Sequence, residues 1–199
     1  MYSHRLVYYE SKRVENKVMS KIKRMFSVGV SLFNVKNLNN DELKAHIHKK
    51  YKIPAKHENF DSDILNDLKG AFISEGQNYV RELFGTEKNI NLKIDKIWGN
   101  THVDQSIGVP HNHRSSLVSA VYYLTKGKLT FLNPYQLLLS HVYKEDIVSY
   151  NELNCDIWTC DMVEGDMIIF NSALQHYAHY DGKDKHERMS IACDMIRET

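Results

Sequence analysis

The sequence predicts an α+β protein in which helices come first and a set of short strands follows. Two observations lead to this expectation. Residues 61–85 carry apolar side chains at the three- and four-residue spacing of a helix, and residues 91–197 break into short β-type segments bounded by turn residues. Helices followed by strands are typical of an α+β domain. We therefore expect a β-sandwich or jelly roll, built mainly from 91–197, with the helices packed on one face.

The first part of the chain contains three shorter candidate elements. Residues 11–25 are charged and are expected to be helical. Residues 26–35 (FSVGVSLFNV) alternate and contain β-branched side chains, which favours a strand. Residues 39–51 open with Asn and Asp, which commonly cap helices, and are expected to form a helix.

The pattern over residues 61–85 predicts the clearest helix. Asp61 or Asp63 can cap its start, and Gly85 can end it. The apolar face of this helix is expected to contain Ile64, Leu65, Leu68, Phe72, Tyr79, Leu83 and Phe84.

The strands are expected after residue 91, where five segments have a β-type pattern. They are NLKIDKIWGN, SLVSAVYYLT, GKLTFLNP, GDMIIFNS and RMSIACDMI. The segment 133–163 lies between two of them and is long for a loop. Long loops in compact domains often act as lids or binding loops. We therefore expect this segment to govern the substrate, using Tyr135, Tyr143, Tyr150 and Trp158.

Size and composition limit the classes of protein to consider. The chain has 199 residues, of which 42% are hydrophobic, so a single domain over 1–199 is expected, with 1–90 as support and 91–199 as the core. The net charge of +1 makes no general case for nucleic acid. No apolar run has the length of a membrane span or the form of a signal peptide. Three cysteines without zinc-like spacing indicate reduced thiols and a cytoplasmic location.

A pair of histidines is the first candidate for a metal site. His111 and His113 follow Pro110, and in extended chain residues i and i+2 share a face. Imidazole suits transition metals, and His176, which follows an apolar strand and a short turn, offers a third ligand. Together these residues form a two-plus-one ligand set on segments that can be neighbours.

A second set of ligands remains open. His102 and Asp104 also stand two residues apart, and a carboxylate would neutralise part of the charge of a divalent ion. They are separated from the following strand by a turn-like QSIG segment, which favours His111 and His113 over them. Mixed sets that include Asp104 are also compatible with the sequence.

An anion site is indicated twelve residues after His176. Arg188 and Ser190 fall on one face of a predicted strand, whereas the opposite face is apolar. An arginine directed into a barrel requires an anion there, and its planar fork matches a carboxylate. Tyr123, on the strand after the histidine pair, can also bond to that carboxylate.

The order of these motifs resembles a known family. WGNTHVDQSIGVPHNHRSSLVSAVYYL, LTFLNP, VEGDMIIFNSALQHYAHY and ERMSIACD resemble successive motifs of the small 2-oxoglutarate/Fe(II)-dependent dioxygenases over residues 91–195. The resemblance implies a double-stranded β-helix, one Fe(II) and 2-oxoglutarate as cosubstrate. It also implies that iron binds to His111, His113 and His176, and the distal carboxylate of 2-oxoglutarate to Arg188, Ser190 and Tyr123.

The chain departs from the family pattern at three points. Arg114 replaces the usual Pro after the histidine pair, and Ala120 replaces a usual Gly. Many members of the superfamily also have His-x-Asp where this chain has His111 and His113. A three-histidine set leaves Fe(II) with its full charge of +2, which should weaken retention of the metal but leaves an open coordination edge.

The resemblance implies an oxygenase that hydroxylates an unactivated C–H bond and releases succinate and CO2. The substrate class stays open between a small molecule and a peptide or protein, and the sequence does not specify the oligomeric state. One alternative is a cupin-like three-histidine dioxygenase without 2-oxoglutarate, which would have no use for Arg188 and Ser190. Another is a non-catalytic β-barrel binding module.

Overall fold

The structure is a computed structural model, and several of the sequence predictions fall outside the part that it describes. The described residues are 28–50, 62–86, 90–102, 106–135, 154–180 and 187–198. The helix predicted over 11–25, the candidate cap Asp61, the candidate ligand Asp104, and Tyr143 and Tyr150 of the predicted substrate segment lie outside them.

The elements follow the predicted order of helices and strands, with one strand ahead of the helices. The helical segments are α1 (Asn40–Lys50), a 3-10 turn η1 (Asp63–Leu65) and α2 (Asn66–Phe84). The strands are β1 (Val30–Asn34), β2 (Leu92–His102), β3 (Ser106–Ile107), β4 (Val118–Tyr123), β5 (Gly127–Leu132), β6 (Ile157–Met162), β7 (Asp166–Asn171), β8 (His176–Tyr180) and β9 (Arg188–Arg197). The structure is mostly β with few helices, in agreement with the predicted order of elements in an α+β protein.

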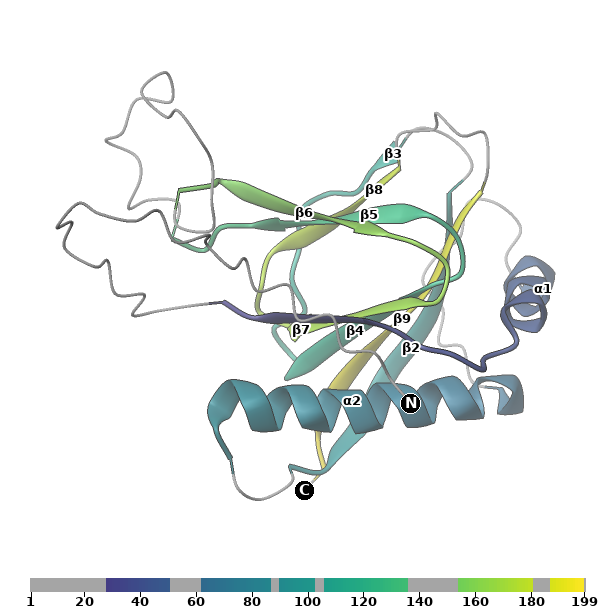
Figure 1. Cartoon of the computed structure of the whole chain (residues 1–199), viewed down its shortest axis with the longest axis horizontal. Helices are drawn as coiled ribbons and strands as arrows, with labels where there is room; N and C mark the ends of the chain where they lie inside the picture. Colours follow the sequence, from purple (N-terminus) through teal and green to yellow (C-terminus); the bar gives the residue numbers. More distant parts are fainter. Residues whose placement is uncertain are drawn as a thin grey trace, which may run out of the picture.

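The strands form two sheets that face each other (Figure 1). One has five strands in the order β1-β7-β4-β9-β2, and the other has four in the order β3-β8-β5-β6. All strand pairs are antiparallel. Because neighbours such as β4 and β9 are far apart in sequence, each sheet brings distant segments side by side.

The five-stranded sheet has a different core on each of its faces. On β9, Met189 and Ile191 belong to the hydrophobic cluster shared with the helices, whereas Ala192 belongs to the cluster between the sheets. Side chains alternate between the two faces of a strand, so β9 supplies both layers. Strand β9 is therefore buried on both faces. This agrees with the sequence, which predicted that the face opposite Arg188 and Ser190 is apolar.

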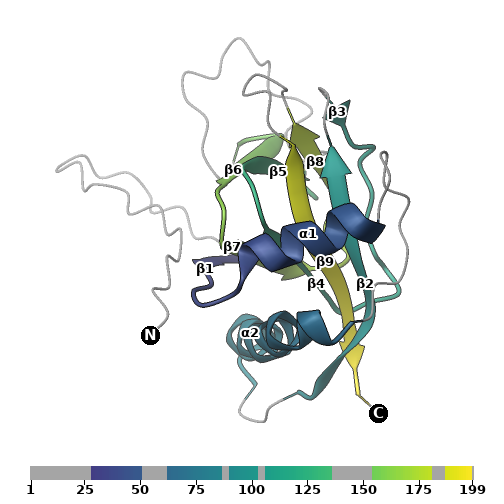
Figure 2. The ribbon, with the colours of Figure 1, turned by 90° about the vertical axis from the view of Figure 1, so that its right-hand side faces the viewer.

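Helix α2 lies against the outer face of the five-stranded sheet (Figure 1). Leu68, Phe72 and Val80 are buried in that layer. Gly76 permits the close approach, because a Cβ there would lie 2.9 Å from Cε of Met195. Helix α1 adds Leu43 and Ile47 to the same core, and Figure 2 shows it crossing in front of β9.

The predicted apolar face of α2 is left uncovered at its C-terminal end. Leu83 and Phe84 are 37% and 54% exposed, whereas Val80 is buried. The helical period alone places all three on or near one face, but the last turn of α2 is not covered by the sheet.

The helix ends test the predicted caps. Helix α1 begins as predicted, because Oδ1 of Asn39 accepts a hydrogen bond from the Glu42 amide at 3.3 Å. The prediction that Asp63 caps the next helical segment is wrong, because Asp63 lies inside η1 and the N-cap residue is Ser62. The other candidate cap, Asp61, lies outside the described residues. Gly85 ends α2 as predicted, in the left-handed conformation with φ of 60°.

Two segments predicted as loop or turn contain strands. Residues 157–162, inside the predicted loop 133–163, form β6 and pair with β5 along its full length. Ser106 and Ile107, in the turn-like QSIG, form β3 and pair with β8. Both strands are at the edges of the four-stranded sheet, where partial exposure weakens the apolar pattern that sequence analysis relies on.

Among the described residues, we find no helix with the length and apolar character needed to cross a membrane.

Candidate functional site

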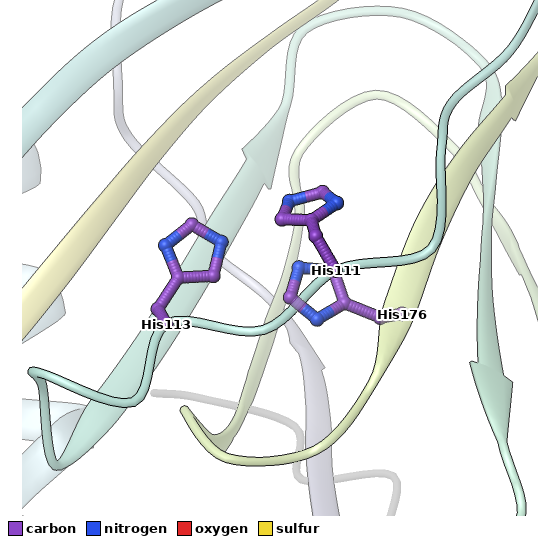
Figure 3. A group of neighbouring side chains, drawn as sticks. All are labelled: His111, His113 and His176. Atoms are coloured by element: carbon purple, nitrogen blue, oxygen red, sulfur yellow. The ribbon is translucent and has the colours of Figure 1, made fainter.

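Three histidines meet between the two sheets. Their candidate ligand atoms, one on each of His111, His113 and His176, all lie within 4.8 Å of one another. Figure 3 shows the three rings side by side, two of them carried by the segment before β4 and one by β8. His176 is buried, His113 is partly buried and His111 is exposed, so the cluster is open on one side.

Backbone hydrogen bonds fix where these histidines lie. The amide of His111 donates to the carbonyl of His176 at 3.0 Å, and the amide of His176 donates back at 2.9 Å. The amide of His113 donates to the carbonyl of Ser172 at 2.8 Å. The cluster is therefore held by the main chain before any metal is considered.

Each ring also has a defined orientation. Nδ1 of His111 donates to the Val109 carbonyl at 2.8 Å, and Nδ1 of His176 donates to the Leu174 carbonyl at 2.9 Å. Nδ1 of His113 donates to Oδ2 of Asp194 at 2.7 Å. Because carbonyl and carboxylate oxygens only accept, Nδ1 carries the hydrogen in all three rings. The lone pair of each Nε2 is left for a metal, the usual arrangement of histidine ligands.

The surroundings of His176 favour its neutral form. Burial lowers the pKa of His176 to about 4, an effect that the hydrogen bond to the Leu174 carbonyl partly opposes. The ring of Phe170 lies edge-on to it, with centroids 4.6 Å apart. A neutral imidazole is the form that binds a metal.

The second candidate pair is placed differently. His102 is the last residue of β2 and stands opposite Arg188 in the strand pairing. It is absent from the only group of potential metal ligands found among the described residues, and Asp104 lies outside them.

The site contains a residue to which sequence reasoning gave no role, Asp194. Its carboxylate is 2% exposed and accepts hydrogen bonds from His113 and, at 2.7 Å, from Ser119. The Ser119 hydroxyl is also hydrogen-bonded to that of Ser172, at 2.9 Å. The signal was available, because Asp194 lies four residues after Ser190 on the inward face of β9.

The predicted anion site lies on the same face of β9. Arg188 is 2% exposed, and Ser190 and Tyr123 are fully buried. The guanidinium lies over the Tyr123 ring, 5.3 Å from its centroid, and one of its nitrogens is 3.4 Å from the phenol oxygen. Burial raises the pKa of Tyr123, so the phenol stays protonated.

Polar atoms at this anion site lack partners among the described residues. Nε and Nη1 of Arg188 and Oγ of Ser190 are buried without a hydrogen bond. An unpaired buried cation is costly, since its charge and its donors need an anionic partner. A carboxylate of a bound ligand would accept hydrogen bonds from these atoms, so the residues present fit a carboxylate group.

Gly127, at the start of β5, makes the space in which Arg188 lies. A Cβ at this position would be 2.8 Å from Cε1 of Tyr123 and 2.9 Å from Nε of Arg188. A Cβ carbon does not lie this close to other side-chain atoms, so the lack of a side chain at Gly127 is needed for the observed arrangement.

Trp98 on β2 lies beside the histidine cluster. Its ring stacks on that of His113 with centroids 5.6 Å apart and planes 13° from parallel. Trp98 therefore forms one wall beside the candidate metal ligands, on the β2 side.

Solved structures share this fold. An epimerase, SnoN from nogalamycin biosynthesis, described as dependent on alpha-ketoglutarate, has a TM-score of 0.57 at 14% identity, covering 86% of this chain and 79% of its own. HygX from Streptomyces hygroscopicus, solved with nickel and 2-oxoglutarate, has a TM-score of 0.58 at 14% identity, covering 85% and 83%. AviO1 from Streptomyces viridochromogenes Tue57 has a TM-score of 0.56 at 10% identity, covering 86% and 91%. At such low identity these similarities concern the fold alone.

Sequence comparison identifies the family. No curated protein sequence matches the chain. Residues 96–194, which include the three histidines, Arg188, Ser190 and Asp194, match the family described as "Putative 2OG-Fe(II) oxygenase". The cofactors named in that description, Fe(II) and 2-oxoglutarate, are those predicted from the sequence. The chain therefore belongs to the 2OG-Fe(II) oxygenase family.

Proposed function

We propose that this protein is an oxygenase that couples the oxidation of 2-oxoglutarate to hydroxylation of a C–H bond in a small molecule. The observation that carries the proposal is the pairing of two features inside one sheet sandwich. One is the group of three histidines whose candidate ligand atoms lie within 4.8 Å of one another, and the other is the set of donors on Arg188 and Ser190 that have no partner among the described residues.

The arrangement along β9 supports a role for both features in one reaction. Ser190 and Asp194 lie four residues apart on the inward face, which is about 13 Å along a strand. Asp194 holds His113, so one face of β9 carries the anion site towards its start and supports the histidine cluster further along.

Each residue then has a distinct task. His111, His113 and His176 would hold Fe(II) through Nε2, and Arg188 and Ser190 would bind the distal carboxylate of 2-oxoglutarate, with Tyr123 against the guanidinium. When bound, the iron and its cosubstrate supply the oxidation: substrate C–H, O2 and 2-oxoglutarate become C–OH, succinate and CO2. The protein orients the reactants and excludes water from the buried side of the site.

We also propose the finer form of the fold. The two sheets would form the double-stranded β-helix implied by the sequence, with α1 and α2 supporting the five-stranded sheet, and residues 1–199 would be one domain. The similarity to SnoN and HygX and the packing of α2 support this assignment.

A small-molecule substrate is supported by the structural neighbours. One structure of HygX holds hygromycin B, and one of SnoN holds nogalamycin RO. Because SnoN is an epimerase, inversion at a carbon centre is the main alternative outcome of the same oxidation. The two outcomes differ in whether an oxygen atom from O2 enters the product.

An anaerobic calorimetric titration tests the proposal. The protein is titrated first with Mn(II) or Fe(II) and then with 2-oxoglutarate. We expect both to bind, with 2-oxoglutarate requiring the metal. Binding of the metal alone would indicate a three-histidine dioxygenase without 2-oxoglutarate, and binding of neither would indicate a non-catalytic module.

A further inference from the structure

We propose that Asp194 is a positioning residue that supplies, through His113, the negative charge that a set of three neutral histidine ligands lacks. This inference rests on the proposed function, since it concerns the metal that the histidines would hold. A divalent ion bound by three imidazoles keeps its full charge, whereas a carboxylate ligand would neutralise part of it. In this structure a carboxylate lies one hydrogen bond behind the ligand.

Both side-chain oxygens of Asp194 lie within hydrogen-bond distance of donors. Oδ2 accepts from Nδ1 of His113 and Oδ1 accepts from Ser119, both at 2.7 Å. Such short bonds are typical of charge-assisted pairs.

The burial of Asp194 makes its charge significant. Asp194 is 2% exposed, and among the described residues its carboxylate accepts hydrogen bonds from the ring of His113 and the hydroxyl of Ser119. A buried carboxylate with no formal cation beside it is unfavourable. A divalent ion on the far nitrogen of His113 would provide the missing cation and would make the imidazole a stronger ligand.

Three strands converge to hold this carboxylate. Asp194 belongs to β9, Ser119 to β4, and Ser172 directly follows β7. The Ser119 hydroxyl connects Asp194 to Ser172, whose carbonyl accepts from the His113 backbone amide. The same network therefore fixes both the ring and the main chain of His113. The other two histidines differ, because their Nδ1 atoms donate to backbone carbonyls.

The test is an anaerobic Co(II) titration of the full chain, followed by competition with a chelating indicator and by the visible absorption of the bound ion. The variants are Asp194→Asn, which preserves shape and removes charge, and Ser119→Ala, which removes the donor that holds Asp194. Asp166→Asn is the matched control, because it removes a carboxylate at the opposite end of β7, about 20 Å from Ser172 along the strand.

We expect Asp194→Asn to weaken Co(II) binding by about 10- to 100-fold and to shift the absorption bands of the bound ion. Ser119→Ala should change both in the same direction by less, and Asp166→Asn should change neither. Thermal unfolding of the metal-free proteins measures the effect of each substitution on the stability of the fold. A substitution that only destabilises the fold would not shift the absorption bands of bound Co(II).

Two outcomes would overturn the inference in different ways. If wild-type protein binds Co(II) and Asp194→Asn binds it equally tightly with the same spectrum, Asp194 has no role at the metal while the proposed oxygenase stands. If Asp194→Asn does not fold, Ser119→Ala provides the test. Wild-type Co(II) affinity and absorption spectrum in that variant would likewise show that Asp194 has no role at the metal. If wild-type protein binds no Co(II), the metal centre itself is wrong.

Discussion

His111 and His176 are hydrogen-bonded to each other through both backbone groups, at 3.0 and 2.9 Å, although they are far apart in sequence. This pair joins the segment before β4 to the start of β8 and sets their rings 4.6 Å apart, centroid to centroid. The candidate metal centre is therefore built on paired backbone rather than on free loops, so its ligands should be preorganised.

The first prediction concerns which histidines hold the metal. Alanine replacement of His111, His113 or His176 should remove most of the bound iron, because each takes away one of three ligand atoms that lie within 4.8 Å of one another. His102→Ala and Asp104→Ala are the controls and should retain iron. Metal content is measured on each folded variant. Loss of iron from Asp104→Ala together with retention in His113→Ala would show a carboxylate ligand instead.

The second prediction concerns the anion site. Arg188→Lys keeps the charge but loses the planar fork, so 2-oxoglutarate should bind markedly more weakly. A hydrogen bond to a charged group contributes about 1.5–3 kcal/mol, which is roughly 10- to 150-fold in affinity. Calorimetry in the presence of Mn(II) measures the change, and circular dichroism checks the fold. Ser190→Ala, a smaller alteration in the same site, should weaken binding less. Unchanged affinity in Arg188→Ala would rule out this assignment.

The third prediction concerns Gly127. Gly127→Ala should displace Arg188 and Tyr123, because the new Cβ would lie 2.9 Å and 2.8 Å from their atoms. Overpacking of this kind costs about 1–3 kcal/mol in stability. It should also weaken 2-oxoglutarate binding while sparing metal binding.

Gly70→Ala is the matched control for that variant. Gly70 lies in α2, where a Cβ would meet no atom within 4 Å. The replacement should raise stability by roughly 1 kcal/mol, since alanine favours a helix over glycine. Urea unfolding measures both proteins. Equal 2-oxoglutarate affinity in wild type and Gly127→Ala would mean that the pocket around Arg188 can relax.

The fourth prediction concerns the three cysteines, none of which forms a disulfide. Burial raises the pKa of Cys160 to about 11 and that of Cys193 well above its ordinary value, so their reactive thiolate forms are scarce at pH 8. Cys155 is only partly buried. Iodoacetamide should therefore modify Cys155 first in the folded protein and all three after denaturation, as peptide mass spectrometry would show. Equal rates in the folded state would contradict the burial of Cys160 and Cys193.

The sequence by itself determined the features that depend on local periodicity and residue chemistry. Alternation on β9 separated Arg188 and Ser190 from the apolar face formed by Met189 and Ile191, and both faces are buried as that pattern requires. The left-handed conformation of Gly85 and the cap at Asn39 follow from the properties of those residues alone.

Only the tertiary structure decided which distant residues become neighbours. Asp194 had no visible partner in the sequence, because His113 and Ser119 reach it only through the pairing of β4 with β9. The exposure of Phe84 and the existence of β6 likewise depend on where each sheet ends. Period and propensity act over a few residues, whereas sheet order joins segments tens of residues apart, and the site is formed by that order.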